Sequence, residues 1–150
     1  MRIISGILKG RVINFVKNSV TRPLKDSVRE NIFNILKHSN LIKPSIKNSN
    51  ILDLYSGIGS FGIECISRGA KKVTFIEQDL NASRILEENL SKLSIKNKSE
   101  VFNSKIESFL ERNIKGKFHI FFFDPPFVDI DFVKNIELVK KKKFLRQIIL

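Results

Sequence analysis

The chain has 150 residues, of which 42% are hydrophobic, and this fits one domain with a packed core. One cysteine and two isolated histidines exclude an internal disulfide and a zinc cluster. No apolar run approaches the length of a membrane span, and the N-terminus has no apolar signal region. We therefore expect a metal-free, soluble, cytoplasmic protein without membrane contact. The net charge of +12 favours an acidic polymer as partner, most simply a nucleic acid, although a lysine-rich surface without a partner has the same composition.

The first forty residues predict a small basic extension. Two short apolar runs around Gly6 and Gly10 predict a β-hairpin or a pair of short strands within 1–16. An extended junction at 21–23 precedes a helix over about 26–37, since proline disfavours the helical conformation in the residue before it. Between residues 1 and 30, seven basic residues stand against two acidic ones, a local charge of +5.

Residues 50–62 combine a buried strand with a glycine-rich turn. The apolar run over 51–54 is typical of a parallel strand that is covered on both faces. Gly57, Gly59 and Gly62 follow at G-x-G-x-x-G spacing, directly before a helical pattern over 60–68. This spacing allows a tight turn and a close approach of a ligand to the N–H groups of the helix start. The segment therefore predicts a site for a nucleotide-like ligand.

Two acidic residues narrow the choice of ligand. Glu77 ends a second predicted strand, 73–77, and lies twenty residues after Gly57, where such folds place a carboxylate on a ribose hydroxyl. A nicotinamide dinucleotide and S-adenosylmethionine both fit this feature. Asp53, beside the glycine turn, repels a pyrophosphate and suits a ligand with an ammonium and a sulfonium group. A side chain that simply caps the turn explains Asp53 equally well.

The remaining chain continues to alternate between strands and helices. Helices are predicted over 81–93 and 105–113 and from about 131, and strands over 99–102, 117–123 and 147–150. Such β-α repeats predict an α/β fold, a doubly wound and mostly parallel sheet with helices on both faces. We expect Cys65 to be a small core residue and the basic run 140–143 to be a solvated helix end.

The segment F-F-F-D-P-P-F, residues 121–127, predicts the chemistry. Asp124 ends a strand and is expected beside the glycine loop, and Pro125 and Pro126 have no N–H groups. The resulting surface offers acceptors only, which suits the two N–H donors of an exocyclic amine, while Phe127 can stack on the attached ring. Hydrogen bonds from the amine localise its lone pair for attack on a methyl group, and Asp124 can take the proton. The alternative is a turn that merely ends the strand.

Five blocks of the sequence carry a resemblance to a known family. They are R-I-I-S-G-I-L-K-G-R, T-R-P-L-K-D-S-V-R-E-N-I-F-N-I-L, L-D-L-Y-S-G-I-G-S-F-G-I-E-C-I-S-R-G-A, V-T-F-I-E-Q-D and F-F-F-D-P-P-F. They resemble the bacterial small-subunit (16S) ribosomal RNA guanine-N2 methyltransferases, and the resemblance covers nearly the whole chain. It implies a Rossmann-like class I methyltransferase that uses S-adenosylmethionine and acts on ribosomal RNA or the small ribosomal subunit, as a monomer or weak homodimer.

The resemblance also implies roles for single residues. The expected cofactor contacts are Asp53, Tyr55, Gly57, Gly59, Glu77 and Gln78, with Asn103 and Ser104 where the family often has an aspartate near the adenine. The expected catalytic loop is Asp124, Pro125, Pro126 and Phe127, the last in place of the usual tyrosine. The expected RNA contacts are Arg2, Lys9, Arg11, Arg22 and Lys25. Residues 1–40 are then the RNA-binding extension and 41–150 the catalytic domain, together one globular unit.

Family members normally continue to a seven-stranded sheet, whereas this chain stops at Leu150, so we expect its C-terminal strands to be truncated. Several other functions fit the acceptor loop. An adenine-N6 DNA methyltransferase or a protein-glutamine methyltransferase also acts on an NH2 on a planar group, although no target-recognition domain for DNA is visible. A catalytically silent RNA-binding relative is a further alternative. An NAD-binding protein is disfavoured by Asp53 and by the D-P-P-F segment.

Overall fold

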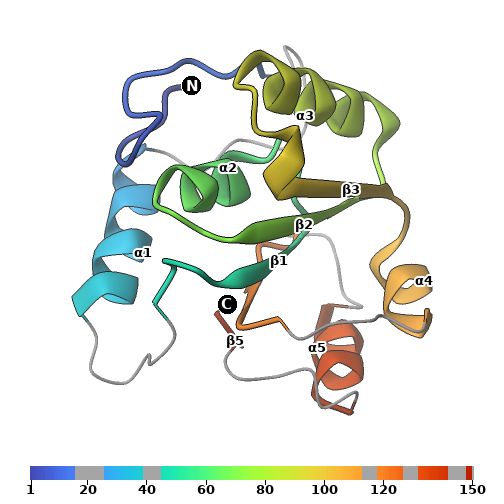
Figure 1. Cartoon of the computed structure of the whole chain (residues 1–150). Helices are drawn as coiled ribbons and strands as arrows, with labels where there is room; N and C mark the ends of the chain where they lie inside the picture. Colours follow the sequence, from blue (N-terminus) through green and yellow to red (C-terminus); the bar gives the residue numbers. More distant parts are fainter. Residues whose placement is uncertain (16–25, 39–44, 113–117, 127–131, 142–147, 150) are drawn as a thin grey trace.

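The computed structural model describes residues 1–15, 26–38, 45–112, 118–126, 132–141 and 148–149. Five parallel strands form one sheet in the order β3-β2-β1-β4-β5 (Figure 1). Their bounds are β1 Asn50–Leu54, β2 Lys72–Glu77, β3 Ser99–Asn103, β4 Ile120–Phe123 and β5 Ile148–Ile149. The chain leaves β1 in one direction and returns to its other side at β4, so the strand order reverses between them. This doubly wound arrangement confirms the predicted Rossmann-like fold class.

Helices cover both faces of the sheet (Figure 1). On one face lie α1 Asp26–His38, α2 Ser60–Ser67 and α3 Leu80–Lys92; on the other lie α4 Ile106–Glu111 and α5 Phe132–Lys141, and a short 3-10 turn, η1 Lys96–Lys98, precedes β3. The separation follows from handedness, because right-handed crossovers that run outward and then back place their helices on opposite faces. None of the helices in the described ranges is both long and apolar enough to cross a membrane.

Two apolar cores result, one on each side of the sheet. Side chains alternate along each strand, so Ile51 faces α2 whereas Leu52 and Leu54 face α4 and α5. On the α2 side, the Phe61 ring stacks on Phe122 at 3.7 Å between centroids and on Phe33 at 5.1 Å. This stack joins α1, α2 and β4. Cys65 is fully buried in the same core, as expected.

The N-terminal segment 1–15 forms a compact hairpin, as predicted, but its pairing is short. One antiparallel bridge joins Arg2 to Val12, and the Ile3 N–H donates to the Arg11 carbonyl at 2.9 Å. Gly6 has φ +84, and a Cβ there would lie 2.0 Å from the carbonyl oxygen of Ser67 in α2. Only glycine therefore lets the hairpin lie this close to the last turn of α2.

A further long-range contact fixes the opposite end of the sheet from the candidate site. His119 had no evident partner in the sequence, yet its Nδ1 accepts the Asn50 N–H at 2.9 Å, across 69 positions. This bond joins the starts of β1 and β4. The role of His119 in the described structure is thus to join two strands.

Candidate functional site

The predicted site residues converge at the carboxyl ends of β1, β2 and β4. Leu54 of β1 lies opposite Phe123 of β4 and Ile76 of β2, so Tyr55, Glu77 and Asp124 leave the sheet at one edge. This is the edge where α/β sheets bind ligands, next to the reversal of strand order.

The glycine loop contains Gly57, Gly59 and Gly62, and these three glycines have different structural roles. Gly57 and Gly59 both have positive φ, +53 and +84, which glycine adopts without strain. A Cβ on Gly59 would lie 2.3 Å from the Leu86 side chain of α3, and one on Gly62 would lie 2.2 Å from the Phe75 ring of β2. A Cβ on Gly57 would meet no atom of the described residues within 4 Å. Gly59 and Gly62 therefore allow close packing, whereas Gly57 leaves open space where a ligand can approach.

Glu77 joins the glycine loop to the end of β2. Its carboxylate accepts the Gly57 N–H at 2.7 Å and the Asp79 N–H at 2.8 Å. The Asn103 amide donates to the Glu77 carbonyl at 3.0 Å and to the Gln78 carbonyl at 3.3 Å, and Gln78 itself is exposed. The predicted ribose-binding carboxylate is thus held in place by the loop. Each oxygen of this half-buried carboxylate has a second lone pair, which can still accept a hydrogen bond from a ligand hydroxyl.

Asp53 is almost completely buried, at 1% exposure. Its Oδ2 accepts the Gly62 N–H at 3.0 Å at the start of α2, which supports the interpretation that it caps the turn. Burial raises the pKa of Asp53 well above its ordinary value, the bond from Gly62 opposes that shift, and the nearby carboxylates of Asp124 and Glu77 add to it. Asp53 makes no salt bridge among the described residues. A contact with a ligand ammonium stays a prediction.

Asp124 follows β4 directly and is accessible to solvent, with Pro125 and Pro126 half-buried beside it. The protein around its carboxyl group still desolvates it enough to raise its pKa. A carboxylate with a raised pKa is a stronger base than a free one, which suits a proton acceptor. Phe127, the expected stacking residue, lies outside the described residues.

The structure adds Asn135, which the sequence analysis did not single out. This α5 residue is 1% exposed, and its amide donates to the Tyr55 hydroxyl at 3.1 Å and to Glu107 of α4 at 2.7 Å. Tyr55 has φ +60, a conformation that is unfavourable for a non-glycine residue. Asn135 therefore fixes the side chain of a strained residue at the start of the loop. The sequence did contain a signal for this residue, because an asparagine within the apolar stripe of a helix indicates a buried polar side chain.

The edge suits an adenosine-containing cofactor. Ser104, whose N–H donates to the Glu77 carbonyl at 3.1 Å, has a buried Oγ without a hydrogen-bond partner among the described residues, so a polar ligand group can satisfy it. Within the same described ranges, no three His, Cys, Asp or Glu side chains are grouped to hold a metal ion.

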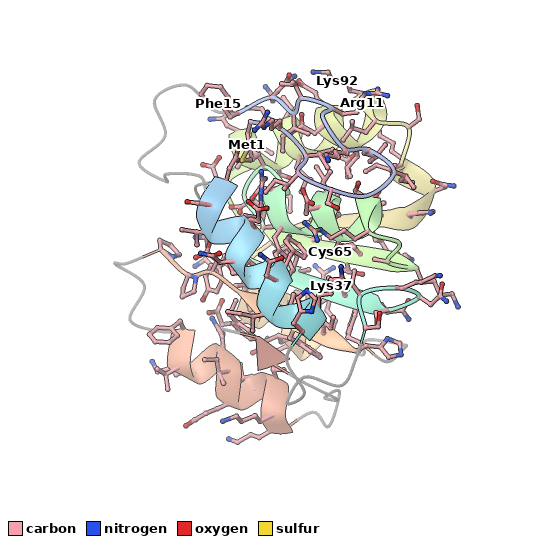
Figure 2. All side chains as sticks on the ribbon, turned by 90° about the vertical axis from the view of Figure 1, so that its left-hand side faces the viewer. Met1, Arg11, Phe15, Lys37, Cys65 and Lys92 are labelled. Atoms are coloured by element: carbon pink, nitrogen blue, oxygen red, sulfur yellow. The ribbon has the colours of Figure 1, made fainter. Side chains whose placement is uncertain are left out.

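The predicted RNA contacts are partly described. Arg2, Lys9 and Arg11 are exposed on the N-terminal hairpin, whereas Arg22 and Lys25 lie outside the described residues. Figure 2 shows Arg11, Phe15 and Lys92 along one edge of the molecule. Arg2 and Lys9 also line a groove of about 300 Å³ between the hairpin and α1, with the acidic Asp26 and Glu30 opposite them.

Arg29, which contributed to the basic count of this region, is not a surface cation. It is 0% exposed and donates to the Arg2 carbonyl at 2.6 Å and to Asp26 at 2.8 Å. Its role is to attach the hairpin to α1.

Comparison with known proteins identifies the family. The family described as conserved hypothetical protein 95 matches residues 1–150. The chain belongs to this family. Among curated relatives, ribosomal RNA small subunit methyltransferase D of Buchnera aphidicola (subsp. Acyrthosiphon pisum) is 34% identical over 97% of this chain and 72% of its own length. The Haemophilus influenzae protein of the same name is 38% identical over 85% of this chain and 64% of its own length.

Solved structures agree with this membership in the conserved hypothetical protein 95 family. The Escherichia coli protein yhhF is 36% identical, with a TM-score of 0.82, over 97% of this chain and 75% of that chain. The resemblance to small-subunit ribosomal RNA methyltransferases that the sequence predicted is therefore confirmed. The chain spans 64% to 72% of the length of the two curated relatives named above.

Proposed function

We propose that this chain methylates the exocyclic N2 amine of a guanine in small-subunit ribosomal RNA, with S-adenosylmethionine as methyl donor. The observation that carries the proposal is the position of Asp124. It follows the last residue of β4, which pairs with the end of β1 directly before the glycine loop, and the two prolines after it offer no N–H groups. The relatives named ribosomal RNA small subunit methyltransferase D support methyl transfer as the reaction and ribosomal RNA as the substrate.

The residues at the strand ends fit the proposed cofactor. Glu77 can accept hydrogen bonds from the ribose hydroxyls, and the open side of Gly57 can face the ligand. The Ser104 hydroxyl, which has no hydrogen-bond partner among the described residues, can meet the adenine with Asn103 and Gln78 nearby. Asp53, Glu77 and Asp124 bring three carboxyl groups together at this edge, which suits a ligand that carries an ammonium and a sulfonium group. When bound, the cofactor supplies a methyl group that is already activated for transfer.

The chain's own residues would act on the acceptor amine. Asp124 can accept one N–H of the amine, orient it, and take the proton that the nitrogen loses when its new bond to carbon forms. Its raised pKa favours that proton transfer. Pro125 and Pro126 leave carbonyl acceptors near the amine, and Phe127 would stack on the base.

The RNA itself would be held by the basic hairpin. Residues 1–40 are proposed as the RNA-binding extension and 41–150 as the catalytic domain. Exposed Arg2, Lys9 and Arg11 would contact phosphates. The target guanine must leave its stack to reach Asp124, so an accessible loop of the RNA is the expected substrate.

The test is methyl transfer from labelled cofactor to small ribosomal subunits that lack modifications, followed by digestion and mass spectrometry of the nucleosides. We expect label in N2-methylguanosine at one position. Label in N6-methyladenine or N5-methylglutamine would replace the proposed acceptor by one of the alternatives. Cofactor binding without transfer to any subunit, RNA, DNA or protein would support the catalytically silent relative.

A further inference from the structure

One buried side chain connects the N-terminal hairpin to the glycine loop. Asn89 of α3 is 0% exposed. Its Oδ1 accepts the Asn14 N–H at 2.7 Å, and its Nδ2 donates to the Asn14 carbonyl at 3.1 Å and to the Ile58 carbonyl at 3.3 Å. These three bonds engage the acceptor and the donor group of one amide.

Only an amide of this size satisfies all three backbone groups. Two of them belong to Asn14, which is thus bound at both its N–H and its carbonyl, and the third belongs to the glycine loop. A carboxylate would face two carbonyl oxygens without a donor, and an apolar side chain would leave buried backbone groups unpaired. Asn89 is therefore matched to both segments at once.

Both segments lie next to proposed ligand contacts. Ile58 stands between Gly57, which has open space beside it, and Gly59, which packs on Leu86 of the same helix as Asn89. Asn14 stands beside exposed Phe15, and the Arg11 guanidinium reaches the Lys92 carbonyl of α3 at 3.4 Å. The proposed RNA-binding arm and the proposed cofactor loop thus share one buried partner, Asn89.

We propose that Asn89 couples the two sites, so that RNA on the hairpin and cofactor at the glycine loop raise each other's affinity. The inference rests on the proposed function. A ligand that immobilises residues 11–15 also immobilises the Asn89 amide and hence the Ile58 carbonyl, which lowers the entropy that the second ligand must lose to order its own site. The coupling must be reciprocal, because it is one free energy shared by two binding equilibria.

The chain offers a matched control for this role. Ser67 of α2 also attaches the hairpin: its Oγ accepts the Leu8 N–H at 3.0 Å and donates to the Ser5 carbonyl at 2.5 Å. Those bonds hold the tip of the hairpin and involve no residue of the glycine loop. Ser67→Ala therefore loosens the hairpin without touching the proposed connection.

The first experiment measures the affinity for S-adenosylhomocysteine, which cannot react, with and without a saturating unmodified small-subunit rRNA transcript. Wild type should bind it more tightly with RNA, by a factor in the range of roughly 5 to 150 that is typical of coupled sites. Asn89→Leu should bring the factor close to 1, and Ser67→Ala should keep it. A factor of 1 in wild type, an unchanged factor in Asn89→Leu, or equal losses in both variants would overturn the proposal.

A second experiment needs no variant and therefore does not depend on whether Asn89→Leu folds. Hydrogen exchange of the wild-type amides is compared before and after addition of S-adenosylhomocysteine. The backbone N–H of Asn14, which is bonded to Asn89, should exchange several-fold more slowly. The exchange rate of the backbone N–H of Leu8, which is bonded to Ser67, should not change. Equal effects at both amides, or none at Asn14, would overturn the coupling while leaving the methyltransferase proposal intact. Failure of wild type to bind S-adenosylhomocysteine at all would overturn both.

Discussion

The glycine loop and the N-terminal hairpin both depend on buried carboxylates, but the charge of those carboxylates is balanced differently. Glu64 of α2 is 0% exposed, accepts the N–H groups of Ile4 and Ser5 at 2.8 and 2.9 Å, and pairs with the Arg68 guanidinium at 2.8 Å. Asp53 is as deeply buried, yet its neighbours are two further carboxylates.

The difference distinguishes a structural anchor, the Glu64–Arg68 pair that holds the hairpin, from the candidate ligand site around Asp53. A buried carboxylate that is paired with arginine and backbone N–H groups is already neutralised, and it contributes a defined position for the chain it binds. A buried carboxylate without a cation is unfavourable in the free protein, and a cationic ligand can relieve that cost. We therefore expect changes at the hairpin anchor to alter stability and changes at the strand ends to alter ligand binding and rate.

The largest effect is expected at Asp124. Asp124→Ala removes the proposed proton acceptor, so single-turnover methyl transfer should fall by about 10²–10⁴, while the unfolding free energy should change by no more than about 0.5 kcal/mol because the side chain is exposed. Asp124→Asn keeps one acceptor oxygen and should retain more activity. Methyl transfer at the wild-type rate by Asp124→Ala would contradict the proposed mechanism.

The next largest effect is on stability, at Glu64. Glu64→Gln leaves the largely buried Arg68 without its charge partner, and we expect a loss of about 3–5 kcal/mol in denaturant unfolding. Glu87→Gln is the matched control, since Glu87 pairs with Lys96 at 3.3 Å with both side chains exposed, and it should cost at most about 1 kcal/mol. Similar losses in the two variants would remove the distinction between a buried anchor and a surface pair.

Asp53 should affect how the unfolding free energy of the ligand-free protein depends on pH. The folded state holds this proton more tightly than the unfolded chain, so the unfolding free energy should fall as pH rises from about 3.8 towards the higher folded pKa. One such proton contributes a slope of at most roughly 1.4 kcal/mol per pH unit.

Asp53→Asn should remove that part of the slope, because the amide oxygen still accepts the Gly62 N–H and carries no charge. The same variant should weaken S-adenosylmethionine binding. Unfolding curves from pH 4 to 8, with and without cofactor, measure both effects. If the variant kept the wild-type slope and affinity, Asp53 would be a turn cap and nothing more.

The smallest expected effect concerns RNA. Each phosphate contact adds about 0.9 to the slope of log affinity against log salt concentration on duplex nucleic acid. The double charge reversal Lys9→Glu and Arg11→Glu should lower that slope by roughly 2 and weaken RNA binding without altering cofactor binding in the absence of RNA. The matched control reverses Lys140 and Lys141, two exposed lysines in the last turn of α5. A larger effect in the control would move the RNA surface to α5.

The sequence by itself determined the order of the strands and α-helices from residue 50 onwards, because these depend on side-chain spacing along a short stretch. It also placed Asp124 beside the glycine loop, since topology rules bring the carboxyl ends of parallel strands to one edge. Boundaries moved by a few residues: the predicted strand over 117–123 begins at Ile120, and the predicted helix over 105–113 ends at Glu111. The interpretations of Phe127, Arg22 and Lys25 stay predictions.

Only the tertiary structure decided which polar residues are buried partners. Arg29 and Asn89 look like surface residues in a helical pattern, yet each is 0% exposed and bonds to the hairpin, which is distant in sequence. The structure also showed that Asp53 accepts the Gly62 N–H, whereas its neighbouring residues fitted a cap and a ligand contact equally. The physical reason is the same in each case. A hydrogen bond depends on the position of both partners, and when they lie 27 or 75 residues apart only the folded chain brings them together.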